Sequence, residues 1–519
     1  MPETGKLFVR QRLRRQYYLD SVALMRLSQQ LAAEAGVSDA ALMMATPANI
    51  EIMQNAGLLD TDVDASPSDL MMAVAASSET AADSALVVAE SLLDAPSSSR
   101  AGEAAGEQQP RSIRQAVAAN PDSNFALISV PGEFAAAEAS KAIRHGLNVM
   151  IFSDNVSVDE EVALKQQARA LGCLVMGPDC GTAIIGGVPM AFANRVRQGS
   201  VGVVGASGTG IQEVTCLLDQ AGIGISHAIG VGGRDLSQQV GGISTLQALD
   251  LLDADAATES LVLISKPPAA EVRDRVIQRI AASQKPAVVC FIGDSNRSVD
   301  AAGKMQMVAT LEAAAQAVAG IASTGGANTE SVPGAGAVSG QRRFIRGLYC
   351  GGTLCAEAQV ILCDQQGLLS NASIPGVGQL DTAADTINRG TDLPAAHCLL
   401  DLGADEFTRG KPHPMIEPAI RDAAIEQSLT DSSTSVVLLD CVLGYGSHID
   451  PAGSIIRVIE KFSRPDGNAV PHVVASVTGT DNDPQDFAAQ VACLRDSGVE
   501  VCESNAAAVR KAMLLAGLS

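Results

Sequence analysis

The chain of 519 residues carries a formal net charge of −22, with 36 Lys and Arg against 58 Asp and Glu. Nucleic-acid surfaces are rich in Lys and Arg, so this balance argues against nucleic acid as a partner. Apolar runs are all too short for a membrane span, so we expect no membrane partner. The 11 cysteines form no CxxC pair, which predicts buried reduced thiols in a cytoplasmic protein and no metal site.

The first 95 residues predict a small α/β domain. Strand-like runs lie at 6–10, 40–45 and 70–76, and helical stripes lie at 21–35 and 80–93. Residues 96–111 are polar and contain no β-branched residue, so they should form a flexible linker.

From residue 112 onward, predicted strands alternate with helices, a pattern typical of a parallel sheet. We expect residues 112–197 to form a Rossmann-like domain of the CoA-binding type. Ligands bind at the carboxyl ends of parallel strands, and three turns follow strands here, at 131–134, 153–155 and 177–182. The candidate substrate- or CoA-binding residues in these turns are Pro131, Asp179, Cys180 and Gly181.

Residues 198–320 predict a second α/β domain around a glycine-rich turn. The β-branched run Val201–Val204 leads directly into Gly205–Gly210, and apolar residues then recur with helical spacing. Free N–H groups and the positive end of the helix dipole make such a turn a candidate phosphate cradle. Its members are Ser207, Gly208, Thr209 and Gly210. An ordinary tight turn between a strand and a helix explains the same pattern.

Two basic residues follow other strands of this domain. Lys266 comes directly after the strand predicted at 261–265, and Arg234 lies in a glycine-rich loop after the strand at 226–231. Lys266 is a candidate catalytic residue, or a solvated lysine before a Pro-Pro turn. Arg234 is a candidate anion ligand, or a solvated surface charge.

Residues 321–341 predict a second linker, and residues 342–519 a last α/β domain with strands at 399–402, 436–439 and 473–477. A second glycine turn follows the middle strand, before a helix predicted to start near Asp450. Its Gly444, Gly446 and Ser447 are candidate phosphate ligands. His448 is a candidate proton donor or acceptor, or a residue that caps its own loop. We expect this turn to face Gly205–Gly210 across one phosphate.

The fold class expected is therefore α/β, with several Rossmann-like or flavodoxin-like parallel-sheet domains and a small N-terminal α/β domain. We find no tandem repeat of fixed period.

Two stretches resemble a known family. Gly177-Pro178-Asp179-Cys180-Gly181 and Val201–Thr209 resemble the α subunit of succinyl-CoA synthetase and related NDP-forming acyl-CoA synthetases. Residues 342–519 resemble the CoA-ligase domain of the β subunit, and with the extra N-terminal domain the whole chain resembles the FdrA family. The resemblance implies a component of an oxamate carbamoyltransferase in allantoin and ureide breakdown. It also implies companion subunits in a hetero-oligomeric complex, and CoA as a possible ligand.

The chain departs from the synthetases at three points. No histidine lies in 293–303, where the resemblance places a phosphohistidine, and Lys266 stands where a Glu would support it. The ATP-grasp half is also missing. The preferred hypothesis is a carbamoyltransferase subunit whose substrates are oxalurate and phosphate and whose products are oxamate and carbamoyl phosphate. The alternatives are an acyl-CoA synthetase that borrows a partner's nucleotide domain, and a non-catalytic scaffold that binds CoA or phosphate.

Overall fold

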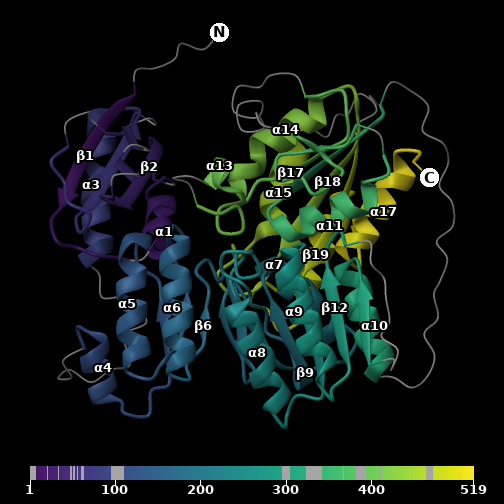
Figure 1. Cartoon of the computed structure of the whole chain (residues 1–519). Helices are drawn as coiled ribbons and strands as arrows, with labels where there is room; N and C mark the ends of the chain where they lie inside the picture. Colours follow the sequence, from purple (N-terminus) through teal and green to yellow (C-terminus); the bar gives the residue numbers. More distant parts are fainter. Residues whose placement is uncertain are drawn as a thin grey trace. The chain divides into compact units, whose positions relative to one another are not determined.

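The computed structural model describes residues 7–19, 21–32, 34–46, 49–50, 53–54, 57–59, 63–94, 110–294, 304–322, 342–365, 367–380, 393–408, 412–462 and 471–518. Nearly all of both predicted linkers and most of 293–303 lie outside the described residues. In the described part, every helix falls short of the length and apolar character that a membrane crossing requires. The chain divides into two compact units, residues 1–111 with 409–412, and the remainder (Figure 1).

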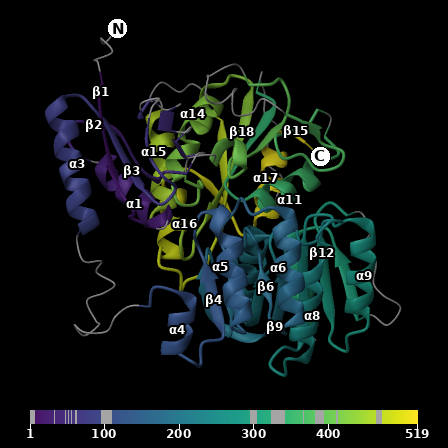
Figure 2. The same ribbon diagram turned by 60° about the vertical axis from the view of Figure 1, so that its left-hand side comes forward.

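Among its described residues, the first unit has a three-stranded antiparallel sheet and two long helices (Figure 2). Its elements are β1 (Phe8–Arg14), α1 (Ser21–Ala32), β2 (Val37–Met44), β3 (Leu70–Ala76) and α3 (Glu79–Asp94), with strand order β1-β3-β2. Both helices cover one face of the sheet, where every second residue of β3 is apolar and buried. This is the small α/β domain that the sequence predicts.

The second unit starts with a three-stranded parallel sheet. Its elements are α4 (Ile113–Ala119), β4 (Phe125–Ile128), α5 (Gly132–Arg144), β5 (Asn148–Ile151), α6 (Val158–Ala170) and β6 (Val175–Met176). An antiparallel hairpin, β7 (Thr182–Ile185) and β8 (Val188–Ala191), then leads into the next sheet. The sequence analysis missed this hairpin. Its signal was the Gly186-Gly187 pair, which adopts φ of 58° and 82° in the turn.

A seven-stranded sheet follows, with strand order β13-β12-β11-β9-β10-β7-β8. Its further elements are β9 (Gln198–Gly205), α7 (Gly208–Gln220), β10 (Ile225–Gly230), α8 (Ile243–Ala254), β11 (Ser260–Ser265), α9 (Ala270–Ala281), β12 (Ala287–Phe291), β13 (Met305–Val308) and α10 (Leu311–Ala322). The five parallel strands β9 to β13 have the flavodoxin-like order 2-1-3-4-5.

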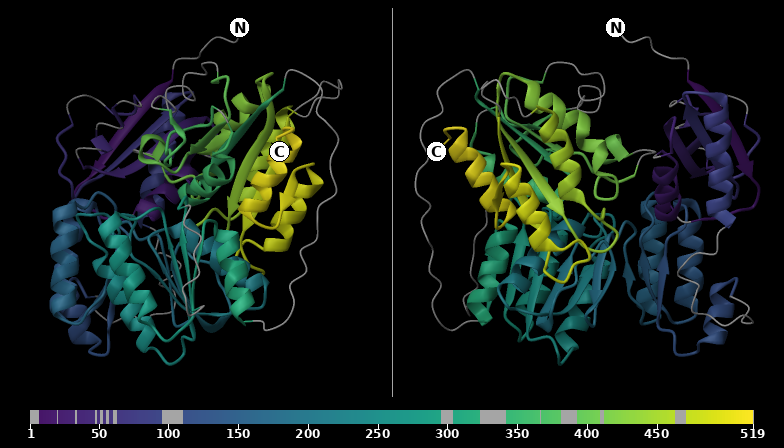
Figure 3. Two further views of the ribbon diagram at one scale, coloured as in Figure 1. Left: turned by 45° about the vertical axis from the view of Figure 1, so that its right-hand side comes forward. Right: turned by 180° about the vertical axis from the view of Figure 1, so that it is seen from behind.

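A second seven-stranded sheet has the order β16-β15-β17-β14-β18-β19-β20 (Figure 3). Its strands are β14 (Phe344–Tyr349), β15 (Leu369–Ser370), β16 (Gly378–Gln379), β17 (Cys398–Asp401), β18 (Thr434–Val442), β19 (His472–Thr478) and β20 (Glu500–Cys502). Its helices are α11 (Gly352–Leu362), α13 (Asp405–Thr408), η2 (Pro418–Arg421), α14 (Asp422–Thr430), α15 (Pro451–Phe462), α16 (Phe487–Asp496) and α17 (Asn505–Leu515). The order β17-β14-β18-β19-β20 is again 2-1-3-4-5.

The two large sheets therefore share one topology, and α7 and α11 both follow the first strand of their half. Gly208, Thr209 and Glu213 of α7 stand at the same helix positions as Gly352, Thr353 and Glu357 of α11. The repeat that the sequence analysis did not find is thus a repeat of topology with few shared residues.

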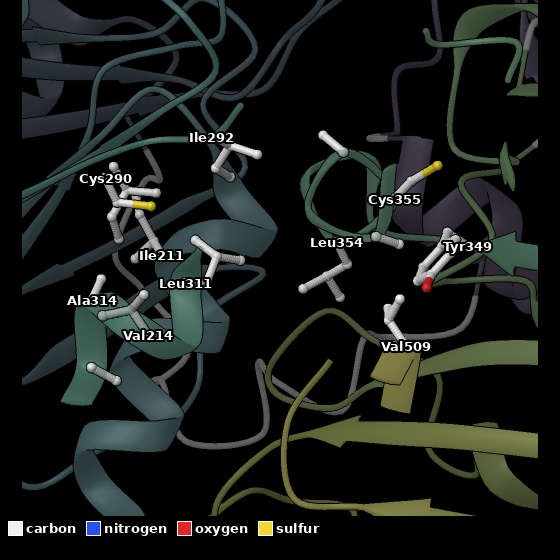
Figure 4. Close-up of a cluster of buried hydrophobic side chains, with 14 of the residues drawn as sticks. Ile211, Val214, Cys290, Ile292, Leu311, Ala314, Tyr349, Leu354, Cys355 and Val509 are labelled. Carbon is white, nitrogen blue, oxygen red and sulfur yellow. The ribbon is translucent and has the colours of Figure 1, made fainter. Parts of the chain in front are cut away.

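One apolar core joins the two halves. It contains α7, α10, α11 and α17 together with one face of each large sheet. Figure 4 shows part of it, with Ile211, Val214 and Leu311 on one side and Leu354, Cys355 and Val509 on the other. Because this core is continuous, it fixes α7 against α11.

A buried polar cluster lies within that contact. The backbone N–H of Asn505 donates to Glu213 at 2.9 Å, and the Asn505 side-chain amide donates to Glu357 at 2.8 Å. The backbone N–H of Leu311 also donates to Glu357, at 2.6 Å. Burial, followed by the nearby Glu213 charge, raises the pKa of Glu357 to about 7.

This pKa predicts how stability depends on pH. Between pH 4.5 and 7 the folded chain holds a proton on Glu357 that the unfolded chain releases, so the free energy of unfolding falls as pH rises through that window. In the wild type, the free energy of unfolding should fall by about 3 kcal/mol across this window, and Glu357→Gln should abolish that fall. Denaturant unfolding of both proteins at pH 5 and pH 8 measures the difference in the free energy of unfolding. The control Glu133→Gln, at an exposed position, should show the same pH dependence of stability as the wild type. The same pH dependence in Glu357→Gln would contradict a raised pKa at Glu357.

Candidate functional site

The N-terminus of α7 leaves two backbone N–H groups free. Ser207 is the N-cap, and its Oγ accepts a hydrogen bond from the backbone N–H of Gly210 at 3.0 Å. In the described part of the chain, the N–H groups of Gly208 and Thr209 have no acceptor. The hydroxyl of Thr209 is partly exposed and also lacks a partner there. These are the donors that an oxyanion needs.

The N-terminus of α11 is held by a buried carboxylate. Asp440 accepts hydrogen bonds from the backbone N–H groups of Cys350 at 2.8 Å and Gly351 at 2.7 Å. The guanidinium of Arg421, also buried, lies 2.9 Å from Asp440. The backbone N–H groups of Gly352 and Thr353, the first two residues of the helix, have no acceptor among the described residues.

The two helices meet at these N-termini. Ser207 Oγ lies 2.5 Å from Thr353 Oγ1, and a Cβ on Gly210 would stand 3.2 Å from Thr353 Cγ2. Each N-terminus carries about half a positive charge. They converge at the carboxyl edges of both large sheets, which makes this point the candidate place for one anion.

Lys266 adds a full positive charge beside this place. It directly follows β11, is exposed, and its side chain has no hydrogen bond or ion pair within the described chain. Its charge acts on Asp401 at the end of β17 and on Cys355 of α11. Burial raises the pKa of Asp401 to about 6, and Lys266 opposes that rise.

In the turn predicted as the second anion site, most backbone N–H groups already have acceptors, whereas the buried hydroxyl of Ser447 has no partner among the described residues. The N–H of Gly444 donates to Gln485 at 3.0 Å, that of Tyr445 to Ala193 at 2.9 Å, and that of His448 to Met415 at 2.8 Å. Gly446 has φ of 80° and packs on Phe192, and the N–H of Ser447 donates to Gly444 within the loop.

The turn that contacts Ser207 is Gly351–Thr353. The loop Gly444–His448 also lies near α7, because Gln212 Nε2 donates to the Leu443 carbonyl at 3.2 Å, so its pairing with Gly205–Gly210 around one phosphate stays a prediction. Helix α15 begins only at Pro451, so the loop is not a helix N-terminus. His448 Nδ1 accepts from the N–H of Asp450 at 3.0 Å, so the imidazole caps its own loop, the structural alternative left open above.

The candidate ligand residues in the turns of the first parallel sheet already make local structural contacts. Pro131 is the N-cap of α5, and the carbonyl of Gly181 accepts from the N–H of Phe192. Asp179 has φ of 54° and its N–H donates to Ser153 at 3.0 Å. The buried thiol of Cys180 donates to the carbonyl of Gly230 at 3.3 Å, and burial raises its pKa to about 12, which excludes a ready nucleophile.

Arg234 is neither free nor merely solvated. Its guanidinium lies 3.0 Å from Glu161 and donates to the carbonyl of Val156 at 2.8 Å. Glu161 and Asp235 in turn both pair with buried Lys165, at 2.8 Å and 2.6 Å. Arg234 thus belongs to an ion-pair network that joins α6 to the loop after β10.

The strand-end turns of the first parallel sheet do not fit the diphosphate of CoA. The first turn of α6 carries Asp159, Glu160 and Glu161, and the first turn of α5 carries Glu133. Acidic first turns oppose a bound phosphate, and the nearby Arg234 is already paired.

A separate pocket of about 450 Å³ lies at the other end of α7. Its lining combines apolar side chains from several elements with exposed Arg495 and Glu503 at its rim. It shares no residue with the two helix N-termini.

Three family models match the chain. The model described as AllF, heavy metal-associated domain, matches residues 8–110; the CoA binding domain matches 196–293; and CoA-ligase matches 348–515. The uncharacterized protein YahF of Escherichia coli is 40% identical over 499 residues, which cover 94% of this chain and 95% of YahF.

The chain belongs to the FdrA family. The matched models place this FdrA-family protein among CoA-ligase-like enzymes. The α subunit of the ADP-forming succinate–CoA ligase of Methanothermobacter thermautotrophicus is 29% identical over 174 residues, 33% of this chain and 57% of that subunit. A dinucleotide-forming acetyl-coenzyme A synthetase of Ca. Korarchaeum cryptofilum matches at a TM-score of 0.33 and 15% identity, over 80% of this chain and 86% of that one.

The segment that matches the heavy-metal-associated model lacks two common metal-binding residue types. Residues 8–110 contain neither Cys nor His. Among the described residues of the whole FdrA-family chain, no three His, Cys, Asp or Glu side chains gather as a metal site would need. The N-terminal domain therefore matches that class without the Cys or His ligands that heavy metals commonly use.

The contact between Ser207 and Thr353 can be measured by a double-mutant cycle. Ser207→Ala and Thr353→Val each remove one hydroxyl, and their combined loss of stability should fall short of the sum by about 1 kcal/mol, because the two share one hydrogen bond. Ser157→Ala removes the N-cap of α6 and should add to Thr353→Val. Additive losses for both pairs would show that the two N-termini are not in contact.

Proposed function

We propose that this FdrA-family chain is the phosphate-handling subunit of an oxamate carbamoyltransferase. The reaction joins hydrogen phosphate to the carbamoyl group of oxalurate. A phosphate oxygen attacks the carbamoyl carbon, the bond from that carbon to the oxamate nitrogen breaks, and the phosphate proton passes to that nitrogen. The products are carbamoyl phosphate and oxamate, with no nucleotide consumed.

The observation that carries the proposal is the pair of helix N-termini joined through Ser207 and Thr353. Free N–H groups of Gly208, Thr209, Gly352 and Thr353 suit an oxyanion, and their dipoles favour negative charge. The chain has no histidine between His227 and His397, so the β12 end that would hold a phosphohistidine has none. Phosphate attack on a carbamoyl carbon needs oriented anions and no such shuttle.

Each group has a role in this scheme. The N–H groups of both helices and the Thr209 hydroxyl hold the phosphate. Lys266 offsets the charge of two anionic substrates brought together, and supports the oxyanion that forms on the carbamoyl oxygen. Companion subunits complete the enzyme.

A second candidate function is an NDP-forming acyl-CoA synthetase that uses a partner's nucleotide domain. The CoA-binding and CoA-ligase models favour it. Incubation with labelled ATP and candidate partners separates the two, because a phosphorylated enzyme supports the synthetase and contradicts the transferase.

Charge reversal at Lys266 should weaken phosphate binding. Lys266→Glu replaces an attractive charge beside the anion with a repulsive one, so calorimetry should show at least about a tenfold loss of phosphate affinity. The matched control is Lys304→Glu, at the amino edge of the same sheet, where the Lys304 carbonyl accepts from Ala287. It should leave affinity within about twofold. Equal effects at both lysines would contradict a local role.

The complete enzyme should form carbamoyl phosphate from oxalurate and phosphate without ATP. We expect turnover when the chain is mixed with its companion subunits, and loss of turnover with Lys266→Glu. Turnover that requires ATP, or its absence with all subunits present, would contradict the proposed function.

A further inference from the structure

One carboxylate oxygen at the anion site has no partner. Asp401 is the last residue of β17, directly opposite Tyr349 of β14, and is only 7% exposed. Its Oδ1 accepts a hydrogen bond from the N–H of Gly403 at 3.0 Å, whereas its Oδ2 accepts none from the described residues.

This free oxygen points at the start of α11. Asp401 Oδ2 lies 2.4 Å from where a Cβ on Gly352 would stand, so it touches the first residue of the helix. Asn371 holds the strand end in place, because its amide group bonds both the N–H and the carbonyl of Asp401, at 2.8 Å and 2.9 Å.

A carboxylate is an unfavourable neighbour for phosphate alone. It repels a dianion, and when ionised it can only accept hydrogen bonds. Asp401 Oδ2 lies beside free N–H donors and accepts no hydrogen bond from the described residues, so it is open to a ligand that carries an N–H group of its own. The site thus combines donors for oxygen with one acceptor for nitrogen.

Resting on the proposed function, we propose that Asp401 Oδ2 accepts a hydrogen bond from the carbamoyl NH₂ and thereby selects carbamoyl over acyl groups. Acetyl phosphate has the charge and shape of carbamoyl phosphate, with CH₃ in place of NH₂. Asp401 is a specificity residue, since a charge-assisted hydrogen bond distinguishes the two ligands by roughly tenfold to hundredfold.

Calorimetry on the full chain with carbamoyl phosphate, acetyl phosphate and inorganic phosphate tests this. Wild type should bind carbamoyl phosphate at least about tenfold more tightly than acetyl phosphate. In Asp401→Asn the amide oxygen must still face the N–H of Gly403, so its NH₂ takes the place of Oδ2 and donates where an acceptor is needed. Carbamoyl phosphate should then lose its advantage, while acetyl and inorganic phosphate bind as tightly as to wild type or more tightly.

Two further variants sharpen the result. Asp401→Ala, which removes the acceptor and the charge, should bring the two acyl phosphates to equal affinity. Glu406→Gln changes an exposed neighbouring acid, bonded to Asn371 at 2.7 Å, and should retain wild-type selectivity. Equal binding of the two ligands by wild type, or selectivity unchanged in Asp401→Asn and Asp401→Ala, would overturn the inference. Failure of oxalurate turnover with selectivity intact would instead overturn the proposed function.

Discussion

The contact between two helix N-termini is the constraint on which the rest of the second unit depends. Ser207 and Thr353 bring together two ends that each carry about half a positive charge. Such ends repel each other unless negative charge is near, and the chain supplies Asp440 and Asp401 on the α11 side. The first N–H groups of both helices have no acceptor among the described residues, which is the basis for proposing an anion there.

The shared topology explains how this contact arises. In each half, α7 or α11 follows the central first strand, so packing the two halves through one core brings equivalent helices together. The pair Glu213 and Glu357, at equal helix positions, then meets at Asn505 inside that core. Burial of these carboxyls is the cost of placing two similar helices face to face, and the amide of Asn505 offsets part of it.

The sequence predicted the strand, turn and helix around Gly205–Gly210 because their signals are local. Val201–Val204 is an unbroken β-branched run, and the glycine turn follows it directly. Strand β14 escaped detection because Arg346 interrupts its apolar pattern. That arginine is 1% exposed, and its guanidinium is bonded to the carbonyls of Ala396 and Pro394 and paired with Asp431. With β14 missed, Gly351 and Gly352 were not recognised as the start of a helix.

The loop at Gly444–His448 shows a different limit of local pattern. The loop has the composition of a phosphate loop, but the N–H groups of Gly444, Tyr445 and His448 donate to distant parts of the sequence, namely Gln485, Ala193 and Met415. Local pattern cannot show that donors are already occupied. The sequence also contained no signal for Asp401, since its proposed role depends on contact with Gly352 of another strand–helix unit.

A crystal structure with vanadate, an electron-dense phosphate analogue, tests the central claim most directly. We predict one vanadate between the first turns of α7 and α11, with its oxygens about 3 Å from the backbone nitrogens of Gly208 and Gly352. Vanadate bound at only one of the two helices, or only elsewhere on the chain, would contradict a shared anion site.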